Sequence, residues 1–334
     1  MRGVYRKGLH RFSILLSAAT FLLVIAGGLV TSTDSGLAVP DWPLSYGQLM
    51  PPMVGGILYE HGHRMVATFV GFLTTVLAIW LWRTESRKWL RNLGVVALLL
   101  VICQGVLGGM TVLFLLPVAI SVSHATMAQT FFALTVFISL STSKWWVETK
   151  EPTVPRSART LPLLVVGAVF IQLILGALMR HTNAGLAVPD FPLAFGSIWP
   201  SMDSASLAEM NEYRAGLDLM PVSAAQVAIH MLHRLWAFVV ASLVMILTVR
   251  TFRNSDSRFR EPVLLLFLLV LFQFLLGALT VWTGKNVAVS TAHVATGSLI
   301  LGCSAALVMA MFRGLLESRE SRFDPDLLAE RGTA

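Results

Sequence analysis

The sequence predicts an all-α, polytopic membrane protein with eight transmembrane helices, arranged as two parallel-repeat four-helix bundles. The 334 residues are 55% hydrophobic and only 13% charged, whereas a soluble domain carries about 25% charged residues. Eight apolar segments approach the ~20 residues that a helix needs to cross a bilayer. Helices satisfy their own backbone hydrogen bonds, as lipid requires. The predicted segments are 12–31, 64–82, 92–113, 122–142, 161–179, 229–249, 262–282 and 292–312.

The formal net charge of +7 would suit a nucleic-acid-binding protein, but its distribution favours a membrane protein without a nucleic-acid partner. Five groups of four basic residues, 20 of the 25, fall on one side of the predicted segments. The positive-inside rule places that side, with both termini, in the cytoplasm of a cell (inner) membrane protein that contacts lipid. The groups are Arg2, Arg6, Lys7 and Arg11; Arg83, Arg87, Lys88 and Arg91; Lys144, Lys150, Arg156 and Arg159; Arg250, Arg253, Arg258 and Arg260; and Arg313, Arg319, Arg322 and Arg331.

An internal repeat organises the chain. Residues 36–47, GLAVPDWPLSYG, return at 185–196 as GLAVPDFPLAFG, an offset of 149 residues, whereas later matches have offsets of 169–170. An insertion of about 20 residues is therefore expected within 197–228. Each copy has four segments, so both enter the membrane in the same direction. We predict an N-terminal half at 1–142, a cytoplasmic linker at 143–160, a C-terminal half at 161–313 and a cytoplasmic tail at 314–334.

Two pairs of histidines occupy matched positions in the two halves. His63 and His124 return as His233 and His293. Each histidine lies about one turn into a helix that starts on the outer side, so the members of a pair can face one another at similar depth in the membrane. Facing imidazoles suit the axial ligation of haem iron. Zinc is disfavoured, because neither half adds a cysteine or further carboxylate ligands.

The residues beside the first histidine of each pair differ between the copies. Glu60 shares a helix face with His63, whereas His230 holds that position before His233. Glu60 could act as a base or stabilise positive charge in a reaction, or it could simply favour a helix N-terminus. His230 is either a support for the site or a helix-start contact. Arg64 and Arg234 could pair with haem propionates or extend to the membrane interface.

Three further patterns accompany the histidines. The repeated proline-containing outer segment could be an interfacial loop or a lid over each site, with Asp41 and Asp190 as hydrogen-bonding anchors. Gln104 and Gln273 are expected to bond between helices rather than to act as ligands, and nearby glycines to allow either close helix approach or room for a macrocycle. Three other histidines have no repeat counterpart, and two of these are expected in solvated loops. The glycines are Gly108, Gly109 and Gly277, and the histidines are His10 and the loop residues His61 and His181. Separately, Cys103 and Cys303 are expected as buried apolar side chains.

With these motifs, nearly the whole chain resembles the haem A synthase family. The resemblance rests on the combination of a four-segment duplication, four placed histidines and an E-x-x-H-R motif. No single piece would be specific. The sequences are GGLVTSTDSGLAVPDWPLSYG at 27–47, EHGHR at 60–64, SHATMAQ at 123–129, HMLHR at 230–234 and TAHVATG at 291–297.

The resemblance implies an enzyme that oxidises the C8 methyl of haem O to a formyl group by successive hydroxylation, for terminal oxidase maturation. It implies that His63 and His124 hold the substrate haem, that Glu60 is catalytic, and that His233 and His293 hold a haem b cofactor. It also implies a haem O synthase and an electron donor as partners, and we consider a homo-oligomer. Many bacterial members carry a cysteine pair in the first outer loop, which is absent from 32–62 here.

Two other functions use the same features. A di-haem b membrane electron-transfer cytochrome would need the four histidines but not Glu60. A transporter built from a parallel repeat would need neither, and would bind no haem.

Overall fold

The computed structural model describes residues 3–150, 152, 154–254 and 257–322. Within these ranges, eight helices are long and apolar enough to cross a membrane, which confirms the predicted class of multi-pass, all-α membrane protein. They are α1 (Lys7–Ser32), α2 (Gly55–Thr84), α3 (Lys88–Leu113), α4 (Val118–Ser141), α6 (Arg156–His181), α8 (Ala224–Asn254), α9 (Arg260–Trp282) and α10 (Val287–Arg322). Three short elements complete the description: α5 (Lys144–Glu148), α7 (Ser204–Ala215) and the 3-10 turn η1 (Ser257–Phe259).

The helices extend beyond the predicted apolar segments. α2 begins at Gly55, nine residues before the predicted start at 64, so Glu60 and His63 lie inside the helix. The preceding Pro51 and Pro52 have no backbone N–H and mark where the helix can first begin. α10 continues to Arg322, so the predicted tail starts within a helix, and its residues 323–334 lie outside the described residues.

Two polar segments contain helices that the apolar pattern does not predict. α7 lies in the expected insertion, and its N-cap Asp203 accepts a hydrogen bond from the Ser206 N–H. α5 lies in the linker, where the Ser143 hydroxyl accepts from the Trp146 N–H. Both starts follow the ordinary capping preference of short polar side chains.

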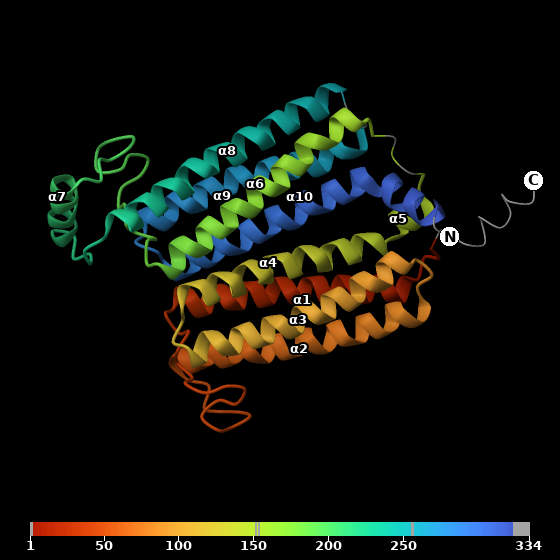
Figure 1. Ribbon diagram of the computed structural model, residues 1–334, viewed down its shortest axis with the longest axis horizontal. Helices are drawn as coiled ribbons and strands as arrows, with labels where there is room; N and C mark the ends of the chain where they lie inside the picture. The colour runs from red at the N-terminus through yellow and green to blue at the C-terminus, as the bar shows by residue number, and fades with distance from the viewer. Residues whose placement is uncertain (1–2, 151, 153, 255–256, 323–334) are drawn as a thin grey trace, which may run out of the picture.

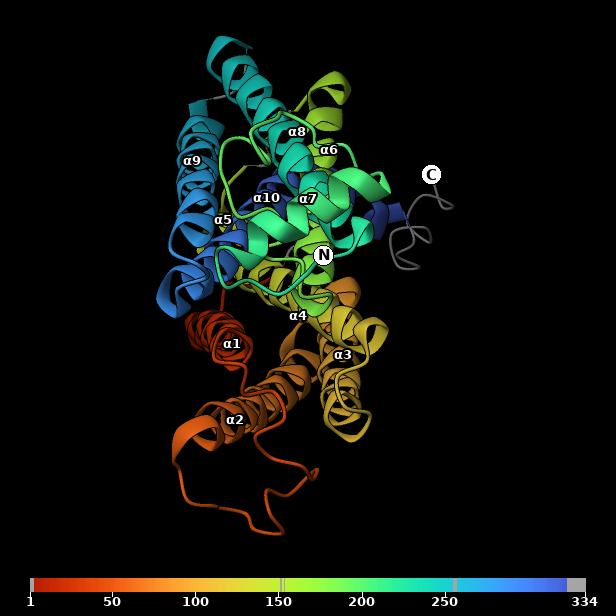
Figure 2. The ribbon, with the colours of Figure 1, turned by 90° about the vertical axis from the view of Figure 1, so that its left-hand side faces the viewer.

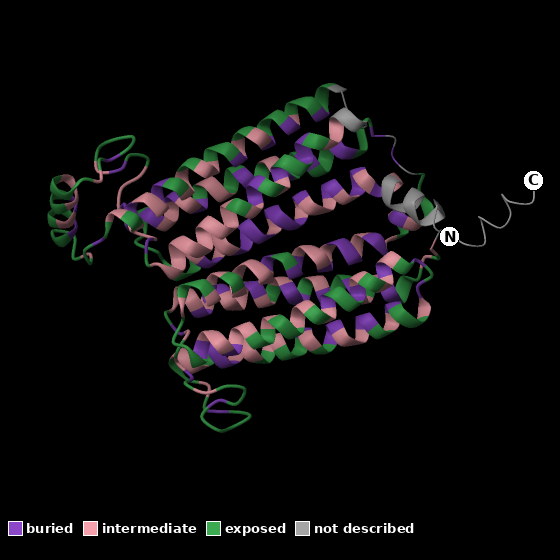
Figure 3. Ribbon diagram, viewed as in Figure 1, coloured by how far each residue is buried: buried purple, intermediate pink, exposed green. Residues whose placement is uncertain are grey.

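The eight long helices run side by side in two groups, one of α1–α4 and the other of α6, α8, α9 and α10. α4 and α10 lie where the two groups meet (Figures 1 and 2). α10 packs against α1 and α4 as well as α6 and α9. Accordingly, 61% of its most apolar stretch is buried, against 17–33% for the other seven helices. Burial follows the faces between helices (Figure 3). The outward faces are apolar and exposed, and Cys103, expected to be buried, lies on such a face.

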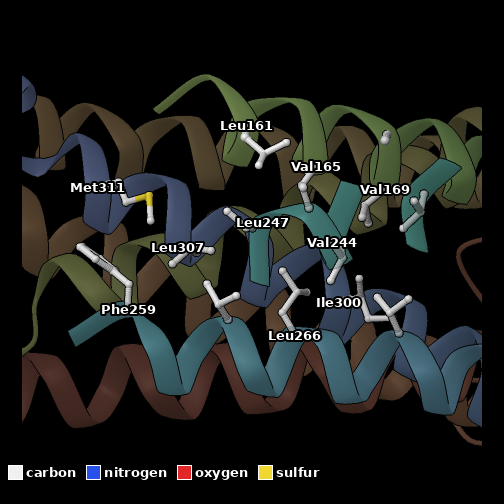
Figure 4. Close-up of a cluster of buried hydrophobic side chains, with 14 of the residues drawn as sticks. Leu161, Val165, Val169, Val244, Leu247, Phe259, Leu266, Ile300, Leu307 and Met311 are labelled. Carbon is white, nitrogen blue, oxygen red and sulfur yellow. The ribbon is translucent and has the colours of Figure 1, made fainter. Parts of the chain in front are cut away.

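Two hydrophobic cores form on either side of the α4–α10 contact. One joins α1–α4 through residues such as Leu16, Leu77 and Ile138. The other joins α6, α8, α9 and α10 through residues such as Val165 and Leu266 (Figure 4).

The connections fall at two distinct ends of the bundle. The start of α1, the turn between α2 and α3, the linker and η1 lie at one end, which we call the terminal end (Figure 1). The segments 33–54 and 182–223 lie at the opposite end, which we call the loop end. The basic groups among the described residues therefore share one end, as the sequence predicts.

The two loops match in backbone detail. Each has an isolated bridge, Ser45 with Gln48 and Ala194 with Ser197. Asp34 and Asn183 both have positive φ, as do Gly47 and Gly196.

Candidate functional site

Each of the four paired histidines packs its ring against a glycine on a neighbouring helix. A methyl group added to the glycine would stand 3.1–3.3 Å from the Cε1 atom of the histidine, closer than ordinary carbon contacts of about 3.5–4.0 Å. Any larger residue would therefore displace the ring. The pairs are His63 with Gly27, His124 with Gly108, His233 with Gly176 and His293 with Gly277.

The histidines come from helices that run from the loop end inward. His63 and His124 lie on α2 and α4, and His233 and His293 lie on α8 and α10. The ring centroids of His233 and His293 are 6.4 Å apart, with their planes at 61°. Two metal–imidazole bonds of about 2 Å each, plus roughly 1 Å from each nitrogen to its ring centroid, span about 6 Å. The second pair therefore has the spacing of two axial ligands.

Unpaired polar atoms also fit a bound group. The Nδ1 atoms of His63, His124 and His293 are buried and have no hydrogen-bond partner among the described residues. Buried polar atoms without partners are uncommon and call for an explanation. A haem between each pair fits these residues, because ligation of one ring nitrogen would fix the ring and its tautomer.

Glutamines fix the helical turns that carry three of the histidines. The amide of Gln104 donates to the His124 carbonyl at 3.0 Å, and that of Gln273 to the His293 carbonyl at 2.9 Å. These contacts confirm the predicted bonds between helices. Gln172 likewise donates to the His233 carbonyl at 3.1 Å. Comparison of the two halves does not reveal Gln172, because Leu23 occupies the matching position of the first half.

Glu60 and His230 accept hydrogen bonds from equivalent residues of the two outer loops. The Val39 N–H donates to Glu60 Oε2 at 2.8 Å, and the Val188 N–H donates to His230 Nδ1 at 3.3 Å. Both side chains are buried, with 4% and 3% exposure. Glu60 also forms an ion pair with Arg64 at 2.6 Å. Glu60 thus connects α2, the helix that carries His63, to the loop.

Arg64 and Arg234 bind the same loops through backbone carbonyls. Arg64 donates to the carbonyls of Asp41 and Leu44, both at 2.8 Å. Arg234 donates to the carbonyls of Asp190 at 2.7 Å and Leu193 at 3.1 Å. The contacts shown are with the loops, and both propionate pairing and extension to the membrane interface stay predictions.

The two predicted aspartate anchors close the loops on themselves instead. Asp41 accepts from the N–H groups of Tyr46 at 2.7 Å and Gly47 at 2.8 Å. The Gly47 N–H contributes most to lowering the pKa of Asp41. Asp190 makes the same bonds to Phe195 and Gly196. The aspartates shape each loop, whereas the residues at 60, 64, 230 and 234 fasten it to the helices.

His61 was expected in solvent, and that expectation is wrong. It is 7% exposed, and its Nδ1 lies 2.8 Å from the Ser45 hydroxyl, because the longer α2 turns this position toward the loop. In the second half the matching positions are Ala194 and Met231, which pack in an apolar cluster instead. His181, also expected in a solvated loop, is instead the last residue of α6 and is half-buried.

The glycines also position the loop. Gly108 and Gly277 face histidines, whereas a methyl group on Gly109 would stand 2.6 Å from the Trp42 ring. The indole of the loop therefore lies directly on α3. Gly27 and Gly176 were not among the predicted residues, although their offset of 149 residues matches the repeat.

Comparison with known proteins identifies the family of the chain. The profile of the COX15-CtaA family, described as cytochrome oxidase assembly protein, matches residues 10–55 and 54–305. A protein of Shouchella clausii named heme A synthase is 30% identical, covering 75% of this chain and 79% of its own. Two more with that name, from Alkalihalophilus pseudofirmus and Halalkalibacterium halodurans, are each 28% identical and cover 92% of this chain and 98% of their own. The chain belongs to the COX15-CtaA family of cytochrome oxidase assembly proteins.

Proposed function

We propose that this membrane protein is a haem A synthase, an enzyme of haem biosynthesis that oxidises the C8 methyl of haem O to a formyl group. The proposal rests mainly on one difference between the two otherwise matched halves. Both have a histidine pair against glycines, but only the first has a buried carboxylate, Glu60, where the second has His230. The names of the curated relatives support the same activity.

The reaction requires substrate binding, electron transfer and proton transfer. Two hydroxylations, each converting R–H, O2, two protons and two electrons to R–OH and H2O, give a gem-diol that loses water to form R–CHO. His63 and His124 hold the substrate haem by its iron. His233 and His293 hold haem b, which when bound supplies one-electron transfer.

Glu60 contributes charge and a proton acceptor beside the substrate site. Its two oxygens bind the Val39 N–H and Arg64, so it takes a proton by giving up one of these bonds. Because the same residues fasten the loop, movement of the loop and availability of the acid are coupled.

The protein's surroundings follow from its charge pattern. We place the terminal end in the cytoplasm and the loop end outside a cell (inner) membrane. A haem O synthase would deliver the substrate, and a separate electron donor would supply the electrons.

The test is conversion in a host without its own haem A synthase. The chain is co-expressed with a haem O synthase, and extracted haems are separated by chromatography and identified by mass. We expect haem A from the wild type. Glu60→Ala should retain bound haem but lose conversion by about 10²–10⁴-fold, the usual contribution of a general base. His230→Ala alters the matching position and serves as the control.

A di-haem electron-transfer cytochrome is the second candidate, favoured by the ligand-like spacing of His233 and His293. It predicts two bound haems, no conversion of haem O, and no effect of Glu60→Ala on electron transfer. These results together would contradict the proposed synthase.

A further inference from the structure

Arg180 is a cation inside a membrane-crossing helix, close to the second histidine pair. It lies on α6 four residues after Gly176, the glycine that contacts His233. Residues four apart share a helix face, and the helix runs toward the loop end. Arg180 therefore lies one turn, about 6 Å, beyond the glycine under His233, toward the loop end.

The hydrogen bonds of Arg180 do not include an acid, and Asp34 acts on its charge electrostatically but forms no ion pair with it. One terminal nitrogen donates to the Gly28 carbonyl at 3.0 Å and the Ser32 hydroxyl at 2.7 Å, both on α1. Among the described residues, no carboxylate lies within 4.0 Å of the guanidinium. A guanidinium has five N–H donors, so several remain for a ligand. Charged groups within spans are costly and usually have a partner.

Ser290, on α10, provides a hydroxyl that also lies toward the loop end from the second histidine pair. Ser290 precedes His293 by three residues on α10, toward the loop end. Its Oγ is buried and has no hydrogen-bond partner among the described residues. Thr291, next to it, donates to Ser32 at 3.3 Å, the same hydroxyl that Arg180 binds. A cation and an unpaired hydroxyl thus lie beyond the two rings of the second pair.

The first half has the hydroxyl but lacks the cation. Ser121 precedes His124 as Ser290 precedes His293, and its buried Oγ also has no partner among the described residues. The residue that matches Arg180 by the offset of 149 is Thr31. Its hydroxyl donates to the carbonyls of Gly27 and Gly28 in its own helix. At this matched position the second site therefore has one more positive charge than the first, in addition to the exchange of Glu60 for His230.

We propose that Arg180 binds a propionate carboxylate of the haem held by His233 and His293, and so makes this the permanently occupied site. The proposal rests on the proposed function, because it takes haem as the ligand. Propionates are the charged edge of the macrocycle, and they would reach Arg180 and Ser290 if that edge faced the loop end. A guanidinium can bind a carboxylate with two hydrogen bonds. Thr31 supplies no such bond, which suits a first site that must release its product.

The experiment measures how fast haem leaves the protein. Detergent-solubilised apoprotein is loaded with ferric haem b or its dimethyl ester, in which both propionates are neutral. Transfer to excess apomyoglobin is then followed by absorbance. Wild type loaded with haem b should show a fast and a slow phase. Arg180→Gln, which keeps an amide able to bond Gly28, should accelerate the slow phase about 10–100-fold, the range for a hydrogen bond to a charged group.

The ester isolates the propionate contact from any general loosening. Wild type loaded with the ester should lose the slow phase, and Arg180→Gln should then add no further acceleration. Arg180→Lys keeps the charge and should restore part of the retention, whereas Thr31→Arg should slow the fast phase. Equal acceleration by Arg180→Gln with haem b and with the ester would overturn the proposal, as would no acceleration at all. No turnover is involved, so retention that depends on Arg180 without conversion of haem O would overturn the synthase and leave this inference standing.

Discussion

Replacing Gly176 by alanine tests the contact between α6 and the His233 ring. The added methyl would stand 3.2 Å from Cε1 of His233, so ring or helix must shift by about 0.3–0.8 Å to restore an ordinary contact. Overpacking of this kind costs about 1–3 kcal/mol. Alanine also favours a helix over glycine by about 0.5–1 kcal/mol, which partly offsets that cost in the absence of haem.

The penalty should fall on haem binding, since a ligated ring cannot move without weakening its bond to iron. A loss of 1–3 kcal/mol weakens binding by about 5–150-fold. Gly167→Ala is the matched control, because Gly167 lies on the same helix with nothing within 4 Å of the added methyl. It should raise the free energy of unfolding by about 0.5–1 kcal/mol and leave haem affinity unchanged. The assay is titration of apoprotein with ferric haem, followed by Soret absorbance. Equal affinity in the two variants would refute the reasoning.

Three further predictions concern the supports of the site. Glu60→Ala should accelerate hydrogen exchange of the Val39 amide, its bonding partner at 2.8 Å, and leave Val188 unaffected; unchanged Val39 exchange would show that Glu60 does not fasten the loop. Gln104→Leu removes the bond to the His124 carbonyl and should lower the free energy of unfolding in detergent by about 0.5–1.5 kcal/mol; greater stability would contradict it. Hydrogen bonds from the Ser201 hydroxyl and the Ser206 N–H lower the pKa of Asp203 from 3.8 to about 2. This depressed folded-state pKa makes the α7 cap fully effective above pH 4, with loss as the pH falls toward 2; the Ser206 amide shift in NMR measures it, and loss by pH 5 would disprove it.

The sequence predicted the features that depend on apolar length and on the repeat. Eight spans and the exchange of Glu60 for His230 follow from comparing one half with the other. The helix start at Gly55 was missed, because residues 55–63 are not uniformly apolar although they are helical. That error also placed His61 in solvent.

Other features depend on contacts that no local pattern contains. The bonds from Arg64 and Arg234 to the loops join residues 20–46 positions apart. Arg180 reaches α1 across 152 positions, so its partner could not be inferred from α6 alone. Gly27 and Gly176 carried a detectable signal in their shared offset, but only their contact with the rings explains why the residue is glycine.

The ratio of haem to protein in four single variants tests the central claim most directly. Wild-type protein loaded with excess ferric haem should bind two haems per chain, measured as the pyridine haemochrome against protein mass. His63→Ala and His124→Ala should each lose the same haem, and His233→Ala and His293→Ala the other, with the remaining haem unchanged in its absorbance. Two tightly held haems in all four variants would contradict the account, because the iron would then be held by other side chains.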